Sequence, residues 1–494
     1  MTQAEHPHHL HREINARQLG MLAIGGAIGT GLFFASGSAI SQAGPGGAML
    51  AYLVMGMAVY CMMQSLGEMA TQLPVAGSFE AYAERFVDKS LGFALGWNYW
   101  FSWSITLAAE FVAGALIVKF WFPDSNATLW AMGFFMALMA LNLLSVRAFA
   151  EAEYWFASIK VTVVLVFLVI GVALILGLLG GEAVGLKHWT LADPVSHAQA
   201  PFPGGLTAIL MVFLVAGFSF QGTEGVGLAA AEAADPQRSV PQAIRSVFWR
   251  ILIFYVGAMF IVGTVIAFND PNLLKGEAGG VAYSPFTLVF QRIPVVGPYA
   301  AHLMNFVILT AVLSAGNASL YVSSRMLQAM ADRGAAPAFF GKLNRRGVPV
   351  AAVWATGLVG ALAFLASTVG EQKIYQMLYN ASGLTGFIIW LGIAICHLRF
   401  RRAWAAQGRT LDQLKFRARF FPVGPWLALG LFVVVVFGAN VWVFQADEFS
   451  WFDFLTNYAP IPGVLLLYFG HKLVRGTRLV RPQDARLDPE PEET

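Results

Sequence analysis

The sequence predicts an all-α polytopic membrane protein with twelve transmembrane helices. Of its 494 residues, 57% are hydrophobic and only 12% are charged, whereas soluble domains carry about 25% charged residues. The mean hydropathy is +0.63. Apolar runs of about 20 residues recur along the chain, and this is the length that a helix needs to cross a bilayer. Barrel strands would instead alternate apolar and polar residues, so the runs favour helices.

The spans follow a polar start, "MTQAEHPHHLHREINARQ", which lacks the pattern of a cleavable signal peptide. Residues 1–18 are therefore expected to form a cytoplasmic tail. We expect spans at residues 19–40, 46–70, 93–120, 127–147, 155–180, 206–232, 246–268, 296–331, 350–369, 374–398, 422–444 and 452–473. The proline-rich, acidic end at residues 474–494 is expected to be a disordered cytoplasmic tail.

The distribution of basic residues predicts the orientation. Most of the 31 lysines and arginines fall in the tails and in alternate connections or span ends, Arg250 and Arg325 among them. The opposite connections hold only Lys119, Lys187, Lys275, Arg292 and Lys373. The positive-inside rule therefore places both termini in the cytoplasm. Lys160 belongs to neither group.

Two spans are weakened by glycine near their middle. Span one contains "IGGAIGTG" at residues 24–31, and span six contains "AGFSFQGTEGVG" at residues 216–227. Each glycine costs a helix interior about 1 kcal/mol relative to alanine. Because five spans separate the two segments, they have opposite orientations, and this pattern predicts a transporter with inverted repeats and interrupted helices. Close packing of helices through small residues is the alternative interpretation.

An interrupted helix has a specific chemistry. Its freed N–H and C=O groups persist in a membrane only where a ligand or a cavity satisfies them. The new helix N-terminus suits a carboxylate, and the freed carbonyls suit an ammonium group. One such site therefore accepts both charges of an α-amino acid without charged side chains.

Other chemistries are not indicated. The sequence contains no Walker loop, metal-ligand cluster or nucleophile elbow, so we expect no enzyme, no metal and no nucleic-acid partner. Cys61 and Cys396 are expected to be small buried residues. The histidines near the N-terminus are interpreted as part of a flexible tail rather than a metal site: His6, His8, His9 and His11.

Several motifs then reveal a family resemblance. They are "IGGAIGTGLF", "GFSFQGTE", "SQAGPGGA", "FALGWNYW", "AEYWFASIKV", "SPFTLVFQ", "ILTAVLSAGN" and "FFPVGP". The chain resembles the amino acid permeases of the amino acid–polyamine–organocation superfamily over residues 12–478. The resemblance implies a LeuT-like fold with two inverted five-helix repeats (19–180 and 206–398), two peripheral helices (422–473), and helices 1 and 6 broken. "GFSFQGTE", "SPFTLVFQ" and "LYNASGLTGF" resemble the lysine-specific bacterial members.

The resemblance also implies positions for the substrate. Its carboxylate would bind backbone amides of the first glycine motif, and its α-ammonium would bind carbonyls from both breaks. Phe218 or Phe220 would form an aromatic gate over the substrate. The residues implied at the backbone site are Ala27, Gly29, Thr30, Gly31, Phe218, Ser219 and Gln221.

A cationic side chain needs an ionised acceptor in a site that excludes water. The candidates are Glu110, one turn beyond Thr106 in span three, and Glu224, which follows the break in span six. Intramembrane acids are functional candidates by default. Glu110 could instead be a structural acid, and Glu224 could instead brace span one or couple to protons.

Lys160, five residues after Trp155, has two interpretations. It could snorkel to the membrane surface. The resemblance implies instead a buried lysine between spans one, five and eight that replaces a sodium site and carries the coupling proton. Its partners would be carbonyls near Gly25 and the polar run of Ser314, Asn317 and Ser319. A proton as coupling ion, with no other cofactor, is the prediction.

The predicted function is import of L-lysine, or a similar cationic amino acid, by proton symport across a bacterial inner membrane. Membrane lipid would be its other partner. Alternatives are a permease for arginine or for aromatic or neutral amino acids, an exchanger of an amino acid for its decarboxylation product, and a receptor that binds without transport. The sequence does not identify a regulatory partner.

Overall fold

The computed structural model describes residues 16–25, 28–29, 31–179, 182–273, 284–293, 297–365, 370–438, 442–445 and 449–488. Within these ranges every regular element is a helix. Eight helices are long and apolar enough to cross a membrane, and two shorter apolar helices accompany them, Val350–Leu365 and Val423–Gly438. The chain is therefore an all-helical, polytopic membrane protein.

The long helices of the first half are α2 (Ser36–Gln72), α4 (Lys89–Val118), α5 (Ala127–Leu144) and α6 (Val146–Ile175). The second half holds α7 (Gly205–Phe220), α9 (Pro236–Arg250), α10 (Gly257–Val265), α13 (Gly297–Asp332), α14 (Val350–Gly360), α16 (Glu371–Ala406) and α17 (Val423–Gly438). The chain ends in α18 (Trp442–Gln445), α19 (Trp451–Tyr458) and α20 (Pro460–Arg475).

The first predicted span is interrupted. Helix α1 (Ala16–Gly25) ends before Ile28 and Gly29, which are not helical, and a π-helical turn, η1 (Gly31–Ala35), leads into α2. Helix α2 itself bends at Gly44, whose φ of 71° lies in the left-handed region that favours glycine. Pro45 follows and has no N–H to donate, so the bend falls between the predicted spans one and two.

The sixth predicted span is interrupted as well. Helix α7 ends at Phe220, and α8 (Gly225–Ala229) begins after a turn in which Gly222 has a φ of 92°. A short 3₁₀ turn, η3 (Ala230–Glu232), extends α8. Both glycine-rich segments are thus breaks in helices, which accounts for glycine at positions where a continuous helix would favour alanine.

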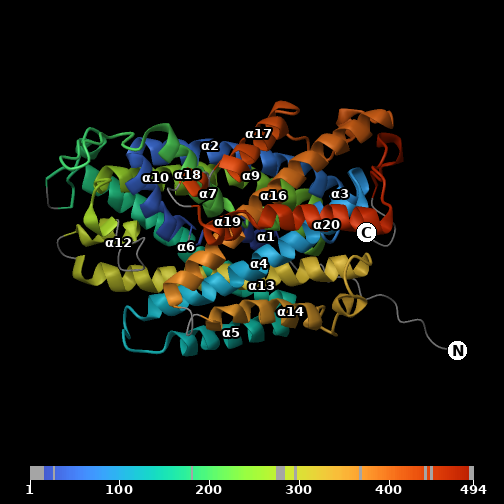
Figure 1. The fold of residues 1–494 in the computed structure, drawn as a ribbon, viewed down its shortest axis with the longest axis horizontal. Helices are drawn as coiled ribbons and strands as arrows, with labels where there is room; N and C mark the ends of the chain where they lie inside the picture. The colour runs from blue at the N-terminus through green and yellow to red at the C-terminus, as the bar shows by residue number, and fades with distance from the viewer. Residues whose placement is uncertain are drawn as a thin grey trace.

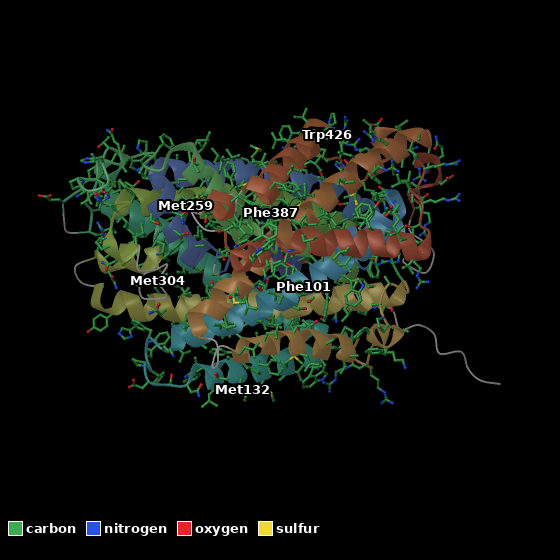
Figure 2. The ribbon with its side chains drawn as sticks, in the orientation of Figure 1. Phe101, Met132, Met259, Met304, Phe387 and Trp426 are labelled. Atoms are coloured by element: carbon green, nitrogen blue, oxygen red, sulfur yellow. The ribbon has the colours of Figure 1, made fainter. Side chains whose placement is uncertain are left out.

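The helices pack side by side around one apolar interior. Helices α4 and α13 run together through the middle of the molecule, and α5 and α14 lie along one edge (Figure 1). Phe387 of α16 is fully buried, whereas Met132 of α5 and Trp426 of α17 are 44% and 53% exposed on opposite edges (Figure 2). Exposed apolar side chains at the edges form the kind of surface that a bilayer covers.

Two short helices lie in connections where we expected no helix. Helix α3 (Phe79–Phe86) packs on α4 and α16 at one end of the bundle, and α12 (Pro285–Gln291) packs on α13 at the other end (Figure 1). Both bury their aromatic residues: Phe79 and Tyr82 in α3 and Phe286 in α12 are fully buried. The connections therefore contribute to the core.

The end of the chain differs from the predicted disordered tail. Residues 476–488 pack against the end of the bundle that carries α3. The Val480 N–H donates to the Val87 carbonyl at 2.8 Å, and Ala485 and Leu487 are buried. Composition predicted disorder because apolar residues are few here, but these few occupy sites between helices. Residues 489–494 lie outside the described residues.

Candidate functional site

The two breaks meet inside the protein, at Gly31 and Ser219. A Cβ atom at Gly31 would lie 2.6 Å from Ser219 Cα, so only glycine allows this approach. The Ser219 hydroxyl donates to the Val215 carbonyl at 3.0 Å and lies 2.9 Å from the Tyr52 hydroxyl. The two breaks therefore approach each other through the backbone atoms of Gly31 and Ser219.

The backbone of the first break is partly engaged. The Gly29 carbonyl accepts from the amides of Leu32 and Phe33, each at 3.2 Å. A Cβ atom at Gly29 would lie 3.5 Å from Ala315 Cβ of α13, an ordinary contact, so Gly29 is less constrained than Gly31. Two predicted site residues, Ala27 and Thr30, lie outside the described residues.

The second break is tied to α16. The Phe218 carbonyl accepts from the Gln221 amide at 3.1 Å, and the Gln221 side chain donates to the Gly383 carbonyl at 2.7 Å. The ring of Phe218 is half-buried. The other gate candidate, Phe220, is fully buried against Tyr255, with ring centroids 4.5 Å apart. Phe218 is therefore the more exposed of the two aromatic side chains at this break.

Glu224 is buried at the start of α8, and protein donors reach both its carboxylate oxygens. Oε1 accepts from the Gly222 amide at 3.3 Å, and Oε2 accepts from the Trp390 indole of α16 at 3.1 Å. These bonds hold the turn of the second break against α16. Bracing was one of the roles that the sequence left open for Glu224.

Arg250 is a residue that the sequence analysis misplaced. Counted there among cations at the membrane surface, it is only 2% exposed at the end of α9. Its Nη2 donates to the Thr223 hydroxyl at 2.8 Å, and that hydroxyl donates to the Phe220 carbonyl at 2.5 Å. A fixed cation thus lies against the second break. Its place near the start of the predicted span 246–268 had assigned it to the membrane surface.

The candidates of span three lie on α4. The Thr106 hydroxyl donates to the Ser102 carbonyl of its own helix at 2.9 Å, and both residues are buried. Glu110, one turn later, is 5% exposed and faces α13, where a Cβ atom at Gly316 would lie 3.7 Å from Glu110 Cβ. Thr106 and Glu110 therefore share a buried face that looks toward α13.

Lys160 is fully buried on α6, where it does not reach the surface. Its Nζ donates to the Ser314 hydroxyl of α13 at 2.8 Å. That hydroxyl donates to Glu153 Oε1 at 2.7 Å, and Lys160 Nζ lies 4.0 Å from the same oxygen. Asn317 Nδ2 donates to Glu153 Oε2 at 3.4 Å, and Asn317 Oδ1 accepts from Asn142 Nδ2 at 2.8 Å.

Sequence reasoning missed Glu153 because it began span five at residue 155. Helix α6 begins at Val146, where the Ser145 side chain caps it by accepting from the Ala148 amide at 3.0 Å. Glu153 and Lys160 are seven residues apart, about two turns, so they share a helix face. A serine cap before "VRAFAEAEYW" is the signal that could have extended the helix.

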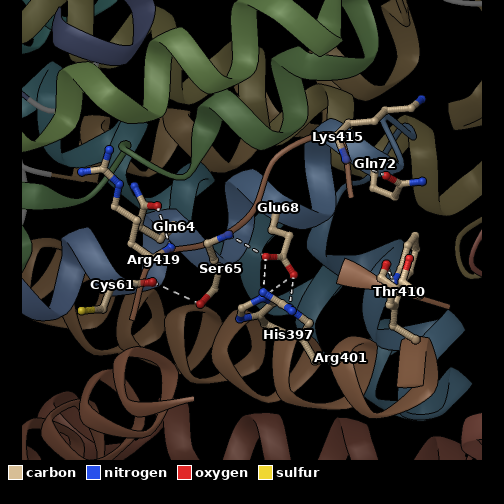
Figure 3. Close-up of polar contacts among 12 residues, drawn as sticks. Cys61, Gln64, Ser65, Glu68, Gln72, His397, Arg401, Thr410, Lys415 and Arg419 are labelled. Atoms are coloured by element: carbon tan, nitrogen blue, oxygen red, sulfur yellow. Dashed lines mark hydrogen bonds and ion pairs between the residues drawn. The ribbon is translucent and has the colours of Figure 1, made fainter. Parts of the chain in front are cut away.

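A second buried carboxylate cluster lies away from the breaks, between α2 and α16 (Figure 3). Glu68 Oε1 accepts from His397 Nε2 at 3.0 Å and forms an ion pair with Arg401, whose Nε lies 2.5 Å away. Glu68 Oε2 accepts from Arg401 Nη2 at 2.8 Å and from the Ala418 amide at 2.6 Å. The cluster fastens the connection between α16 and α17 to α2.

Two interrupted helices that meet inside a polytopic membrane protein define the architecture of a secondary transporter. The amino acid permease family matches residues 18–482. The lysine-specific permease LysP of Escherichia coli K12 is 49% identical over 473 residues, covering 96% of this chain and 95% of the relative. The chain belongs to the amino acid permease family.

Two further relatives are similar over nearly the same length. The lysine-specific permease LysP of Lactococcus lactis is 45% identical, covering 96% of this chain and 92% of the relative. The histidine permease HisP of the same organism is 42% identical, covering 98% of this chain and all of the relative. Family membership makes this chain an integral membrane transporter of amino acids and not an enzyme.

Proposed function

We propose that the chain imports L-lysine by proton symport across a bacterial inner membrane, with alternating access around a site between the broken helices. The observation that carries this proposal is the close approach of the two helix breaks at Gly31 and Ser219, where an added Cβ atom would lie 2.6 Å from Ser219 Cα. The names of two relatives, both lysine-specific permeases, support lysine as the substrate. The histidine permease keeps other substrates open, among them arginine and aromatic or neutral amino acids.

The proposed architecture is LeuT-like, with twelve membrane helices, inverted repeats at residues 19–180 and 206–398, and two peripheral helices at 422–473. The eight long helices, the two shorter apolar ones and the paired breaks support it. We propose that both termini are cytoplasmic, because the basic residues gather on their side. The bundle end that carries α3 and residues 476–488 is then the cytoplasmic end.

Recognition of the substrate's α-carbon groups would use backbone. The amides of residues 29–31 would bind the carboxylate, since amides at a helix start attract anions. The carbonyls of Ala27, Phe218 and Gln221 would bind the α-ammonium, and Phe218 would cover it. The position of Phe218 at the second break and its partial exposure support this role.

Recognition of the lysine side chain would use an acid. Glu110 is proposed as the acceptor of the ε-ammonium, because it is buried beside Thr106 on the face toward α13. Glu224 holds the second break through Gly222 and Trp390, so its loss would weaken binding of every substrate. Glu110→Gln should therefore act on lysine selectively, whereas Glu224→Gln should not.

Coupling would use Lys160. Complete burial and the 2.8 Å bond to Ser314 support a lysine that links α6 to α13 when charged. Loss of its proton would weaken that link and favour a different arrangement of the helices. Exchange of internal for external amino acid is the alternative mechanism, because exchange needs the binding site but no net proton movement.

Uptake of labelled lysine by purified protein in liposomes tests the proposal. We expect accumulation when the outside is acidic, no effect of sodium, and weak competition by neutral amino acids. Accumulation that ignores the pH gradient would overturn symport, and stronger competition by arginine or histidine would overturn the substrate assignment.

The site itself can be tested with Gly31→Ala. The added Cβ meets the Ser219 backbone, and overpacking of about 1–3 kcal/mol should weaken lysine binding about tenfold or more. Gly20→Ala on α1 is the matched control, because no atom lies within 4 Å of its added Cβ. Unchanged binding by Gly31→Ala would contradict a site at the meeting of the breaks.

A further inference from the structure

The buried chain of side chains between α6 and α13 extends beyond Lys160. We propose that Glu153 receives the coupling proton from Lys160 through the Ser314 hydroxyl and releases it on the cytoplasmic side. This inference rests on the proposed proton symport. It adds a second residue to the pathway, an acid that sequence reasoning had placed in a loop.

The geometry of the three groups supports a relay rather than direct transfer. Lys160 Nζ lies 4.0 Å from Glu153 Oε1, too far for a hydrogen bond. Ser314 Oγ lies 2.8 Å from the ammonium and 2.7 Å from the carboxylate, so it accepts from one and donates to the other. A hydroxyl is suited to this position because it has both a donor and acceptor lone pairs.

The transfer balances within these three side chains. The Nζ–H bond of Lys160 breaks as an O–H bond forms on Ser314. The original O–H bond of Ser314 breaks as an O–H bond forms on Glu153 Oε1. The products are a neutral amine, an unchanged serine and a neutral carboxylic acid, and no other reactant is required.

Burial lowers the free energy of the neutral forms of Lys160 and Glu153 relative to their charged forms. Glu153 is 1% exposed and Lys160 is fully buried, and holding two charges in such an interior carries a large desolvation penalty. The long 3.4 Å contact from Asn317 to Glu153 Oε2 orients the carboxylate in either protonation state. Asn142 fixes Asn317 in turn at 2.8 Å.

The neighbouring element gives the proton an exit. Helix α1, the half-helix before the first break, packs on α6. Arg17 of α1 donates to the hydroxyl of Tyr154, the residue next to Glu153, and lies 4.1 Å above its ring. A movement of α1 away from α6 would break this contact and admit water to Glu153. The proposed exit therefore opens with the helix that carries half of the substrate site.

Few other ionisable groups face this chain. Helix α1 brings Arg17, and Glu110 of α4 interacts electrostatically with Lys160. Arg325 of α13 is paired with Glu232 at 2.6 Å. The other described helices packed against α6 are α5, α10 and α12, and they carry no ionisable side chain. Glu110 is therefore the acid that competes with Glu153 for the role.

The test compares gradient-driven accumulation of lysine with lysine–lysine exchange, using the purified full chain in liposomes. Glu153→Gln should lower accumulation about 100-fold or more, the scale of a lost proton-transfer group, and should leave exchange near the wild-type rate. Glu153→Asp should recover part of the accumulation. Glu151→Gln is the matched control, because this exposed acid lies on the same helix, and its accumulation should equal that of the wild type.

Ser314→Ala provides a second variant should Glu153→Gln fail to fold. It leaves both charged groups in place at 4.0 Å and should slow accumulation about tenfold or more. Wild-type accumulation by Glu153→Gln or by Ser314→Ala overturns the relay, and loss in Glu110→Gln alone moves the role to Glu110. If accumulation by the wild type does not depend on the pH gradient, the proposed symport is overturned instead. Failure of the relay and failure of the symport are therefore distinguishable.

Discussion

Glu153 and Glu68 are buried glutamates that each face a cation, and they are held in different ways. Glu153 reaches Lys160 through a serine hydroxyl, with 4.0 Å between the charged atoms. Glu68 meets Arg401 directly through both carboxylate oxygens, and His397 and a backbone amide add further bonds. In the proposed relay, the first arrangement lets a proton move, because its cation is a lysine and its bridge is a hydroxyl. The second keeps its charges, because arginine does not release its proton in proteins.

The difference teaches how to separate a moving charge from a fixed one in a membrane protein. Both clusters are buried and both join helices distant in sequence, so burial alone does not distinguish them. The chemistry of the cation and the presence of an intervening hydroxyl do. We therefore call the first cluster, Glu153–Ser314–Lys160, the relay, and the second, Glu68–His397–Arg401, the clamp.

The largest expected effect is in the relay. Lys160→Ala should abolish accumulation of lysine driven by a pH gradient, because the only lysine that contacts Ser314 in the described residues is lost. Exchange of internal for external lysine should persist. Flux assays in liposomes measure both. Full accumulation in this variant would remove Lys160, and the relay with it, from the coupling pathway.

The next effect is in the clamp and concerns stability. Arg401→Ala leaves Glu68 with a buried charge that only His397 and one amide offset, and breaking a buried pair in this way costs about 3–5 kcal/mol. Thermal unfolding in detergent measures the loss. The neighbouring, exposed Arg402→Ala should unfold like the wild type. If the Arg401 variant were equally stable but lost gradient-driven accumulation, the distinction between clamp and relay would fail.

A smaller effect separates the members of the clamp. His397→Leu removes one bond of 3.0 Å to Glu68 and leaves both bonds from Arg401 in place. A hydrogen bond to a charged group contributes about 1.5–3 kcal/mol, and the better packing of leucine offsets part of that loss. Unfolding should shift less than in Arg401→Ala, and the pH dependence of uptake should not change. A displaced pH profile would show that His397 titrates during transport.

The smallest effect is at the edge of the clamp. Gln72 Oε1 accepts from the Lys415 amide at a long 3.4 Å, and Lys415 is exposed, so water can replace the bond. Gln72→Met should change stability by about 0.5 kcal/mol or less. Thermal unfolding in detergent measures this change, and the Arg401→Ala variant, unfolded under the same conditions, provides the comparison. A loss as large as that of Arg401→Ala would mean that the connection to α17, rather than the ion pair, holds the clamp.

Prediction from sequence succeeded where local chemistry decides structure. The glycines of residues 24–31 and 216–227 predicted two interrupted helices, and the helices end near those positions because glycine weakens a helix and permits close approach. Lys160 was singled out because a cation within an apolar run needs a partner. Its bond to Ser314 joins two of the residues that were proposed together.

Prediction failed where the position of a residue depends on where a helix ends or on contacts between residues distant in sequence. Glu153 was assigned to a connection and Arg250 to the membrane-surface end of the span 246–268, because apolar windows end where charges begin. In the structure both residues are buried among partners inside the protein. The clamp joins residues more than 300 positions apart, such as His397 and Glu68, with a separation of 329. No periodicity in a single sequence reports such a contact. The packing of residues 476–488 was missed for the same reason.

The packing of those last residues has a consequence for how the protein is made. Arg85 of α3 donates to the Asp488 carbonyl at 3.2 Å, and Arg399 of α16 donates to the Phe86 carbonyl at 3.0 Å beside it. The ribosome releases residues 476–488 only after every helix from α1 to α20 has been synthesised. Until then, the surface of α3 and the end of α16 stay uncovered. Residues 476–488 therefore complete this face as a late step of biogenesis, and a stop codon after α20 would leave a membrane-inserted chain with this face uncovered.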